Sequence, residues 1–308
     1  MKHRLILAEK YASEFLEKFI KKIKNKKILI RLKNRFPLLT LNLVIKPLGH
    51  FRYRNEARLF YGKKVKSLTS QKSILFFTVH KCASTLVVKI IRELSEKMNI
   101  IPIDLDGFII THENNNEAVF EDDNFLKQIF VSEGFYYGAL RYFRRVPNIN
   151  NYNIFLMLRD PRDVLTSMYF SMAYSHTIFD KKMINYRQSV RDMSIDEFVL
   201  FNMGGYNKKY NEYINELMGK ENVLFLKYEQ MVTDFPTWLN EMSSSLGIYD
   251  EEIIDRLIDE NSFQKKKEDI HSHVRNIHPG DHKIKLKAET IEILNKEFAS
   301  VLKALDYK

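Results

Sequence analysis

The stretch from residue 73 to residue 98 most constrains what this chain can fold into. Residues 73–77 are apolar and rich in aromatic side chains, which is typical of a buried strand. From Leu86 to Met98 apolar residues recur at helical spacing, which predicts a helix packed on a sheet. A short loop that carries Lys81 and hydroxyl side chains lies between them. The sequence therefore predicts a strand, a polar loop and a helix in direct succession.

This loop has the features of an anion-binding site. The unpaired amides of a first helical turn and the positive end of the helix dipole favour a phosphate or a sulfate, and the Lys81 ammonium adds a full charge. The loop departs from the pattern GxxxxGK[ST], because its lysine comes first and it contains no glycine. This departure argues against an ordinary ATPase or GTPase.

Apolar strand-like and amphipathic helix-like segments alternate along the rest of the chain. Strands are expected at 73–79, 100–104, 128–133, 153–159 and 222–228, and helices at 84–98, 161–175, 195–217, 235–246 and 288–304. This alternation predicts an α/β fold, a P-loop-like parallel sheet with helices on both faces. In such sheets ligands bind beyond the carboxyl ends of the strands. The residues expected there are Lys81, Glu133, Arg159 and Tyr228.

The positive charge of the chain is concentrated near its N-terminus. The formal net charge is +10, and residues 1–72 hold 20 Lys and Arg against 4 Asp and Glu. We therefore divide the chain into a basic, mostly helical N-terminal extension, residues 1–71, and an α/β domain, residues 72–308. The extension is either a solvated basic helix with a segment packed on the domain, or a surface anchor on anionic lipid or another polyanion. No motif indicates nucleic-acid binding.

Composition also bears on the compartment. The sequence contains no run of about 18 apolar residues, so no spanning helix is expected. Residues 1–19 mix charges throughout and lack the apolar core of a secretory signal. Cys82 is the one cysteine, which excludes an internal disulfide framework and is typical of a reducing compartment. We expect a cytoplasmic protein, with peripheral membrane contact through the basic extension as the open alternative.

A second junction between a predicted strand and a predicted helix begins at Arg159. Its planar guanidinium leaves the strand end in a position suited to a phosphate, and Pro161 is placed to start a helix. Ser167 lies two turns into that helix, within reach of the same oxygens. Alternatively, Arg159 pairs with Asp160 or Asp163 and only ties the turn. The segment taken alone favours this second interpretation.

Together the two junctions resemble the sulfotransferase family, whose donor is 3′-phosphoadenosine 5′-phosphosulfate (PAPS). The family's first motif, a lysine followed by small residues, a Thr-Thr pair and an apolar or aromatic residue, resembles residues 81–86. Its second, Arg-Asx-Pro-Lys/Arg-Asp with a later serine, matches 159–167 without a gap. Its third, Arg-Lys-Gly-x-x-Gly-Asp-Trp-Lys, is similar to 275–283, and its Tyr-Glu-Asp turn to 227–229. The resemblance covers about residues 72–304.

The resemblance implies an enzyme that moves a sulfuryl group from PAPS to a hydroxyl or amine by in-line transfer, without a metal. It implies that the Lys81 loop holds the 5′-phosphosulfate, that Arg159 and Ser167 hold the 3′-phosphate, and that Arg275 and the turn at Gly280 close over the same end. The donor-binding residues it implies are Lys81, Cys82, Ala83, Ser84, Thr85, Leu86, Arg159, Ser167, Tyr228, Arg275, Gly280 and Lys283. A donor with phosphates at both ends needs two separated cationic cradles, and this chain supplies two.

The chain departs from the family's motifs at several positions. Leu86 stands where many members carry a tryptophan that stacks on adenine. Asn276 and Ile277 replace a Lys-Gly pair, and His282 replaces the tryptophan of the third motif. These changes predict weaker donor binding, or donor binding that rests on Arg275 and Lys283.

The acceptor must lose a proton, which requires a positioned base, and the resemblance points to a histidine or glutamate between the first two motifs. Glu133 is the first candidate, because the strand predicted at 128–133 ends on it. His112 is the second and His80 the third. Lys81 completes the candidate catalytic set. The alternative for Glu133 is a salt bridge with Arg141 or Arg144.

Two rival functions stay open at this point. One is an ATP-dependent, kinase-like P-loop enzyme, and the other is a non-enzymatic polyanion-binding protein on an inactive nucleotide fold. Arg159 and Ser167 count against the first, since ATP has no 3′-phosphate to occupy that cradle. The acceptor is a small molecule, a carbohydrate or a lipid. The four histidines between residues 271 and 282 lack cysteine partners, so no metal site is expected there.

Overall fold

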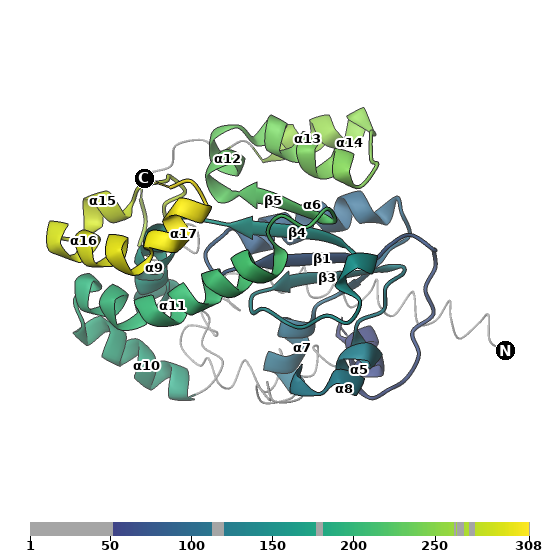
Figure 1. The fold of residues 1–308 in the computed structure, drawn as a ribbon, viewed down its shortest axis with the longest axis horizontal. Coiled ribbons are helices and arrows are strands. Elements are labelled where there is room, and N and C mark those ends of the chain that lie inside the picture. The colour runs from purple at the N-terminus through teal and green to yellow at the C-terminus, as the bar shows by residue number, and fades with distance from the viewer. Residues whose placement is uncertain are drawn as a thin grey trace, which may run out of the picture.

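A five-stranded parallel sheet lies at the centre of the fold (Figure 1). The computed structural model describes residues 52–112, 120–176, 181–261, 263, 268–270 and 275–307. The strands are β1 (Ile74–Thr78), β2 (Ile101–Ile103), β3 (Phe135–Leu140), β4 (Asn153–Leu158) and β5 (Val223–Lys227). They follow the order β2-β3-β1-β4-β5, and every neighbouring pair is parallel. The predicted parallel α/β fold is confirmed.

Helices surround this sheet. The α-helices are α5 (Arg54–Phe60), α6 (Ser84–Glu96), α7 (Leu105–His112), α8 (Asp123–Ile129), α9 (Pro161–Phe170), α10 (Lys181–Asp192), α11 (Ile195–Leu217), α12 (Tyr228–Thr233), α13 (Phe235–Ser245), α14 (Glu251–Glu260), α15 (His282–Lys285), α16 (Ala288–Glu297) and α17 (Ala299–Ala304). A 3-10 helix, η3 (Ile149–Asn151), precedes β4, and a π-helix, η4 (Ser171–Ser175), extends α9. Helices α12–α14 lie along the β5 edge, and α5, α7 and α8 lie along the opposite edge (Figure 1). The strand arrows point toward the C-terminal helices α15–α17.

Four of the five predicted strands are confirmed, and the one predicted at 128–133 is wrong. Helix α8 occupies residues 123–129, because Asp122 caps its N-terminus by accepting from the amides of Asn124 and Phe125. Leu126 and Ile129 are buried at helical spacing. The third strand in the chain is instead Phe135–Leu140, which is buried throughout.

The predicted helices are confirmed with small changes of length. The bounds of α11 are those expected, because Ser194 and Glu197 form a capping box that fixes its start. The helix predicted at 288–304 is divided at Phe298 into α16 and α17.

Residues 1–51 lie outside the described part of the chain, so the predicted extension stays a prediction, as does its boundary with the domain. Within residues 52–71, helix α5 packs on the body of the fold. Leu59 is buried, and the ring of Phe60 lies 5.3 Å from Phe108 and 5.0 Å from Phe125, between ring centroids. In the described parts of the chain, no helix combines the length and the apolar character that crossing a bilayer requires.

Candidate functional site

The loop that carries Lys81 joins β1 to α6 at the carboxyl end of the central strand. Lys81 and Ala83 both have left-handed backbones, with φ of 66° and 50°. Non-glycine residues rarely adopt this conformation, and such strain is concentrated at functional sites. Ala83 is also the N-cap of α6, and no side chain caps the helix. A left-handed loop that runs into the N-terminus of a helix suits an anion, and the assignment of an anion site to this loop stays a prediction.

Lys81 lies in a partly buried and positive environment. Burial, followed by the charges of Arg159 and Arg275, lowers the pKa of the Lys81 ammonium to about 8. Three cations close enough to act on one another are stabilised when an anion lies between them. Within the same loop, Ser84 is buried, Thr85 is exposed and Leu86 is half-buried against the core.

Arg159 links the ends of three strands. Its Nη1 donates to the backbone oxygen of Lys81 at 3.1 Å, and its guanidinium carbon lies 4.2 Å from the centre of the Tyr228 ring. Its backbone oxygen accepts from the hydroxyl of Tyr210 at 2.6 Å. The side chain is buried and its Nε has no partner in the described residues. The Lys81 loop and Arg159, the two cationic groups that the sequence predicted, therefore lie side by side at the carboxyl ends of β1 and β4.

Aspartates near Arg159 do not neutralise it fully. Asp160 pairs with Arg162 instead, through contacts of 3.0 Å to Nε and 2.7 Å to Nη2. Asp163 is 3.9 Å from Arg159 Nη2, at the limit of an ion pair. The tie within the turn is thus present but weak, and Arg159 also reaches the Lys81 loop. Ser167 is buried on α9.

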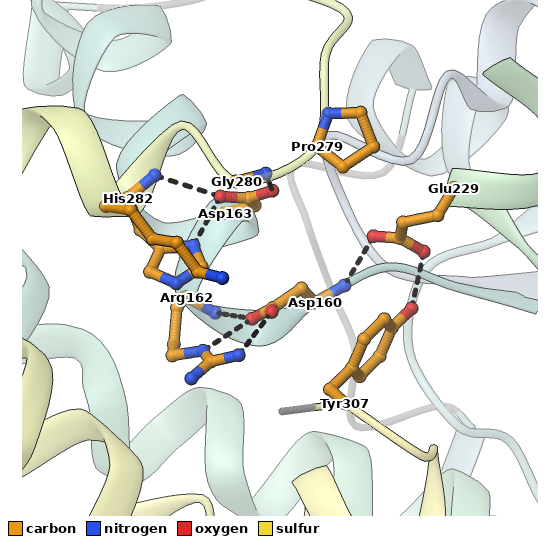
Figure 2. A pocket seen from close by; sticks show the side chains of 9 residues that line it. Asp160, Arg162, Asp163, Glu229, Pro279, Gly280, His282 and Tyr307 are labelled. Atoms are coloured by element: carbon orange, nitrogen blue, oxygen red, sulfur yellow. Dashed lines mark hydrogen bonds and ion pairs between the residues drawn. The ribbon is translucent and has the colours of Figure 1, made fainter. Parts of the chain in front are cut away.

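Asp163 holds the C-terminal loop against α9 (Figure 2). Its carboxylate accepts from the amide of Gly280 at 2.7 Å and from the amide of His282 at 3.0 Å, and it contacts His282 Nδ1 at 2.6 Å. Burial alone would raise the pKa of Asp163, but the hydrogen bonds from His282 and the charge of Arg159 hold it at about 2. Asp163 therefore positions the third motif next to the second.

Arg275 of the same loop is also engaged. Its guanidinium pairs with Glu268 and Asp281 and lies 4.1 Å from the centre of the Phe170 ring. The hydroxyl of Tyr228 donates to the backbone oxygen of Ile277 at 2.9 Å. The loop thus contacts the Tyr228 side chain, and its closure over a bound nucleotide stays a prediction.

A cavity of about 260 Å³ lies beside this region (Figure 2). Asp160, Arg162, Asp163, Glu229, Pro279, Gly280, His282, Lys283 and Tyr307 line it. Glu229 accepts from the amide of Asp160 at 3.0 Å and from the Tyr307 hydroxyl at 2.5 Å. Gly280 and Lys283, which the sequence assigned to the donor, line this cavity, whereas Lys81 and Arg159 do not.

The expected position of Glu133 is wrong. Glu133 precedes β3 and is exposed, and it forms a bridge with Lys72, which precedes β1. Lys81 follows β1, so the two side chains lie at opposite ends of a parallel sheet. The structure therefore removes the reason for assigning Glu133 as the base. The expected salt bridge of Glu133 is also wrong, because Arg141 and Arg144 both pair with Asp106.

The other two candidate bases have different outcomes. His112 ends α7, and its side chain lies outside the described residues, so its assignment stays a prediction. His80 directly precedes Lys81 at the end of β1. Burial and the charges of four neighbours, Lys209 first, lower the pKa of His80 well below its usual range. His80 is therefore neutral at neutral pH.

Cys82 is a core residue rather than a reactive one. Its side chain is fully buried, and burial raises the pKa of its thiol to about 12. Among the described residues, no three His, Cys, Asp or Glu side chains are grouped as metal ligands, and His271 and His273 lie outside them.

Sequence reasoning missed Arg141. It is the first residue beyond β3, and its Nη2 donates to Ser84 Oγ at 3.0 Å, which places a further cation at the Lys81 loop. Asp106, in the first turn of α7, is 3.4 Å from Arg141 and 3.6 Å from Arg144. The reason is that the third strand was predicted at 128–133. With the observed bounds of β3, Arg141 directly follows the carboxyl end of that strand.

Comparisons with known proteins identify the class to which this fold and site belong. The sulfotransferase domain model matches residues 145–303, just over half of the chain. The chain belongs to the sulfotransferase family and is an enzyme of that class. The matched segment contains Arg159, Ser167 and Arg275 and begins after the Lys81 loop.

Solved structures resemble the chain more distantly. A mouse sulfotransferase SULT7A1 complexed with PAP has a TM-score of 0.48 and 14% identity, over 80% of this chain and 88% of that one. Retinol dehydratase in complex with androsterone and the inactive cofactor PAP has a TM-score of 0.48 and 17% identity, over 82% and 85%. Sulfotransferase STF9 from Mycobacterium avium has a TM-score of 0.43 and 8% identity, over 84% and 82%. No curated protein is significantly similar in sequence.

Proposed function

We propose that this enzyme transfers a sulfuryl group from PAPS to a hydroxyl, or an amine, of its acceptor. The observation that carries the proposal is the hydrogen bond of 3.1 Å between Arg159 Nη1 and the backbone oxygen of Lys81. It joins two cationic cradles into one site, which suits a nucleotide that has anionic groups at both ends. Within the described part of the chain, Nε of the buried Arg159 has no hydrogen-bond partner and no side chain caps α6, and both features fit such a ligand.

Each cradle has a separate task in this proposal. The Lys81 ammonium and the first amides of α6 hold the 5′-phosphosulfate and stabilise the charge that develops on the leaving phosphate. Arg159 and Ser167, which is buried on α9, hold the 3′-phosphate, and Tyr228 supports the guanidinium through its ring. The C-terminal loop, held by Asp163, covers this end with Arg275.

His80 is the base that the geometry supports best. The acceptor oxygen forms a bond to sulfur while the bond between sulfur and the 5′-phosphate oxygen breaks, and the acceptor proton must leave. His80 lies next to the Lys81 loop and is neutral, so its imidazole has a free lone pair for that proton. His112 remains an alternative base, and the acceptor is a small molecule, a carbohydrate or a lipid.

Ligand-induced thermal shifts test the donor assignment. We expect 3′,5′-bisphosphoadenosine (PAP) to raise the melting temperature of the full chain by several degrees more than ATP, because ATP has no 3′-phosphate. Ser167→Ala should reduce the difference between the two nucleotides. Equal shifts with PAP and ATP, or no shift with either, would contradict the proposal and favour the kinase-like or the polyanion-binding alternative.

A further inference from the structure

The peptide group that joins Arg159 to Asp160 is held from both sides. Its oxygen accepts from the Tyr210 hydroxyl of α11 at 2.6 Å, and its nitrogen donates to Glu229 Oε1 of α12 at 3.0 Å. Both polar atoms of this peptide therefore have a side-chain partner, and the two partners come from different helices. Because the peptide directly follows the Cα atom of Arg159, these bonds fix the backbone from which the guanidinium extends.

The start of α12 also holds the side chain of Arg159. Tyr228 is the first residue of this helix, and the centre of its ring lies 4.2 Å from the guanidinium carbon of Arg159. Glu229 is the next residue and accepts from the peptide. Two consecutive residues of α12 thus set the backbone position of Arg159 and the orientation of its guanidinium together.

Glu229 is itself oriented by Tyr307. The Tyr307 hydroxyl donates to Glu229 Oε2 at 2.5 Å, while Oε1 accepts from the amide of Asp160 (Figure 2). The terminal torsion of a glutamate is broad, so a carboxylate with one partner can still rotate. With a partner on each oxygen, the carboxylate of Glu229 is held in one orientation.

Tyr307 reaches Glu229 from a segment that is 78 residues away in the chain. Asp306 has a left-handed backbone, with a φ of 53°, and the amide of Tyr307 donates to the backbone oxygen of Leu302 on α17 at 2.8 Å. The Nζ of Lys227, the last residue of β5, lies 5.0 Å from the centre of the Tyr307 ring. These contacts fix the place of the Tyr307 hydroxyl.

The electrostatics of Glu229 favour a role in the site over simple packing. Burial raises the pKa of Glu229, and the hydrogen bonds from Tyr307 and from the amide of Asp160 lower it. Both donors are uncharged, so they offset the burial of a carboxylate less fully than a paired cation would. Perturbed carboxyl groups of this kind are concentrated at functional sites. The charge of Glu229 also supports the positive charge of Arg159.

We propose that Tyr307 and Glu229 are positioning residues for the donor. Tyr307 orients the Glu229 carboxylate, and Glu229 fixes the peptide after Arg159, so that the guanidinium is aligned for the 3′-phosphate. A planar guanidinium binds a phosphate through directed hydrogen bonds, which makes its alignment important for affinity. The inference rests on the proposed function, because it takes Arg159 as the group that binds the 3′-phosphate. It adds that Tyr307, outside the three motifs, determines how strongly the enzyme prefers a 3′-phosphorylated nucleotide.

Two nucleotides that differ only in the 3′-phosphate test this inference: PAP and adenosine 5′-monophosphate (AMP). Their affinities for the full chain are measured by calorimetry, and the ratio of the two affinities reports the contribution of the 3′-phosphate. Tyr307→Phe keeps the ring and removes the hydroxyl. We expect this variant to reduce the ratio about fivefold, or about 1 kcal/mol, which is typical of one hydrogen bond. Its affinity for AMP should not change.

Substitutions of Glu229 separate position from charge. Glu229→Gln retains an oxygen that can accept from the amide of Asp160 and should keep most of the ratio, whereas Glu229→Ala should lose about tenfold of it. Equal losses in these two variants would assign the effect to charge and overturn the positioning role. Tyr249→Phe is the control for Tyr307→Phe, because it makes the same change at a tyrosine that is 75% exposed, and it should leave the ratio unchanged.

Steady-state kinetics should show the same separation between binding and turnover. In Tyr307→Phe we expect the KM for PAPS to rise about fivefold while kcat stays within about twofold, because the Lys81 loop is not altered. A role in stability alone would lower the melting temperature of the variant without changing the preference for PAP over AMP.

The outcomes separate this inference from the donor proposal. If Tyr307→Phe lowers the affinities for PAP and AMP equally, or changes neither, the positioning role is overturned and the donor proposal stands. If Tyr249→Phe reduces the ratio as much as Tyr307→Phe does, the assignment to Tyr307 is overturned. If the unmodified chain binds PAP no more tightly than AMP, the donor proposal itself is overturned.

Discussion

Two groups of side chains lie at the carboxyl ends of the strands: the proposed donor-binding residues on the β4 side of β1, and the residues that follow β3 on its other side. The two groups differ in how deeply their side chains are buried. On the donor side, Arg159 and Asp163 are almost fully buried, with 2% and 0% of their surfaces exposed, and Asp163 accepts from two backbone amides. On the β3 side, Tyr142 is 47% exposed and Lys209 is half-buried. The proposed donor residues are thus held by buried contacts, while the β3 side presents larger side chains at an accessible surface.

This difference suits a two-substrate enzyme. Burial strengthens charge interactions, and fixed groups need not reorganise when the reaction occurs, so the donor side is suited to stabilising a constant phosphate framework. The β3 side, whose groups are more exposed, is accessible to a second substrate.

The largest effect is expected at the Lys81 loop. Lys81→Ala should lower kcat by about 10²- to 10³-fold, because it removes a cation that stabilises the leaving phosphate in a partly buried site. Steady-state kinetics with PAPS and a sulfated product detected by mass spectrometry would measure this. Lys97→Ala, at the exposed end of α6, is the control and should retain activity. Comparable kcat values for the two variants would contradict the role of Lys81.

Removal of the proposed base should have the next largest effect. We expect His80→Gln to lower kcat by about 10²-fold while PAP affinity stays within about twofold, because glutamine cannot take the proton. The pH profile of kcat/KM should lose its acidic limb in the variant. A variant with nearly normal turnover would exclude His80 and direct attention to His112.

The hydrogen bonds of Asp163 to the C-terminal loop should matter chiefly for the stability of the fold. Asp163→Ala leaves the amides of Gly280 and His282 without their acceptor, and should lower the free energy of unfolding by about 3 kcal/mol, measured by urea denaturation. Asp163→Asn retains one acceptor oxygen and should lose less. Equal stability of the alanine variant and the unmodified protein would show that the C-terminal loop is held by other contacts.

A smaller effect is expected from pH. Because burial and neighbouring cations lower the pKa of Lys81 to about 8, its ammonium charge is present below that pH and is lost as the pH rises through it. PAP affinity should therefore be constant up to about pH 7 and fall about tenfold by about pH 9. Lys81→Arg should bind PAP without this decline, since arginine keeps its charge. A decline that persists in Lys81→Arg would assign it to another group.

The smallest effect is expected at Glu133. This residue is exposed at the far end of the sheet, so Glu133→Gln should change kcat and stability by no more than about twofold and about 0.5 kcal/mol. A loss of tenfold or more in kcat would mean that the amino end of the sheet takes part in the reaction.

Local sequence patterns determined most of the strands and helices of this protein. Two strand–loop–helix junctions, at Lys81 and Arg159, could be located because a buried strand, a polar turn and an amphipathic helix are each specified by adjacent residues. Ser194 and Glu197 fixed the start of α11 in the same local way. The parallel sheet, the order of its elements and the sulfotransferase family all followed from such short-range signals.

Only the tertiary structure decided which residues around β3 lie near the Lys81 loop. The apolar residues around Ile129 suit a strand or a helix equally well, and packing against the fold together with the cap at Asp122 made them a helix. That shift moved Glu133 to the wrong end of the sheet and brought Arg141 to the site. Lys209 lies in the middle of a long helix, where nothing in the neighbouring residues marks it. Its place beside Tyr142 depends on contacts between segments far apart in the chain, and such contacts form only when the whole domain folds.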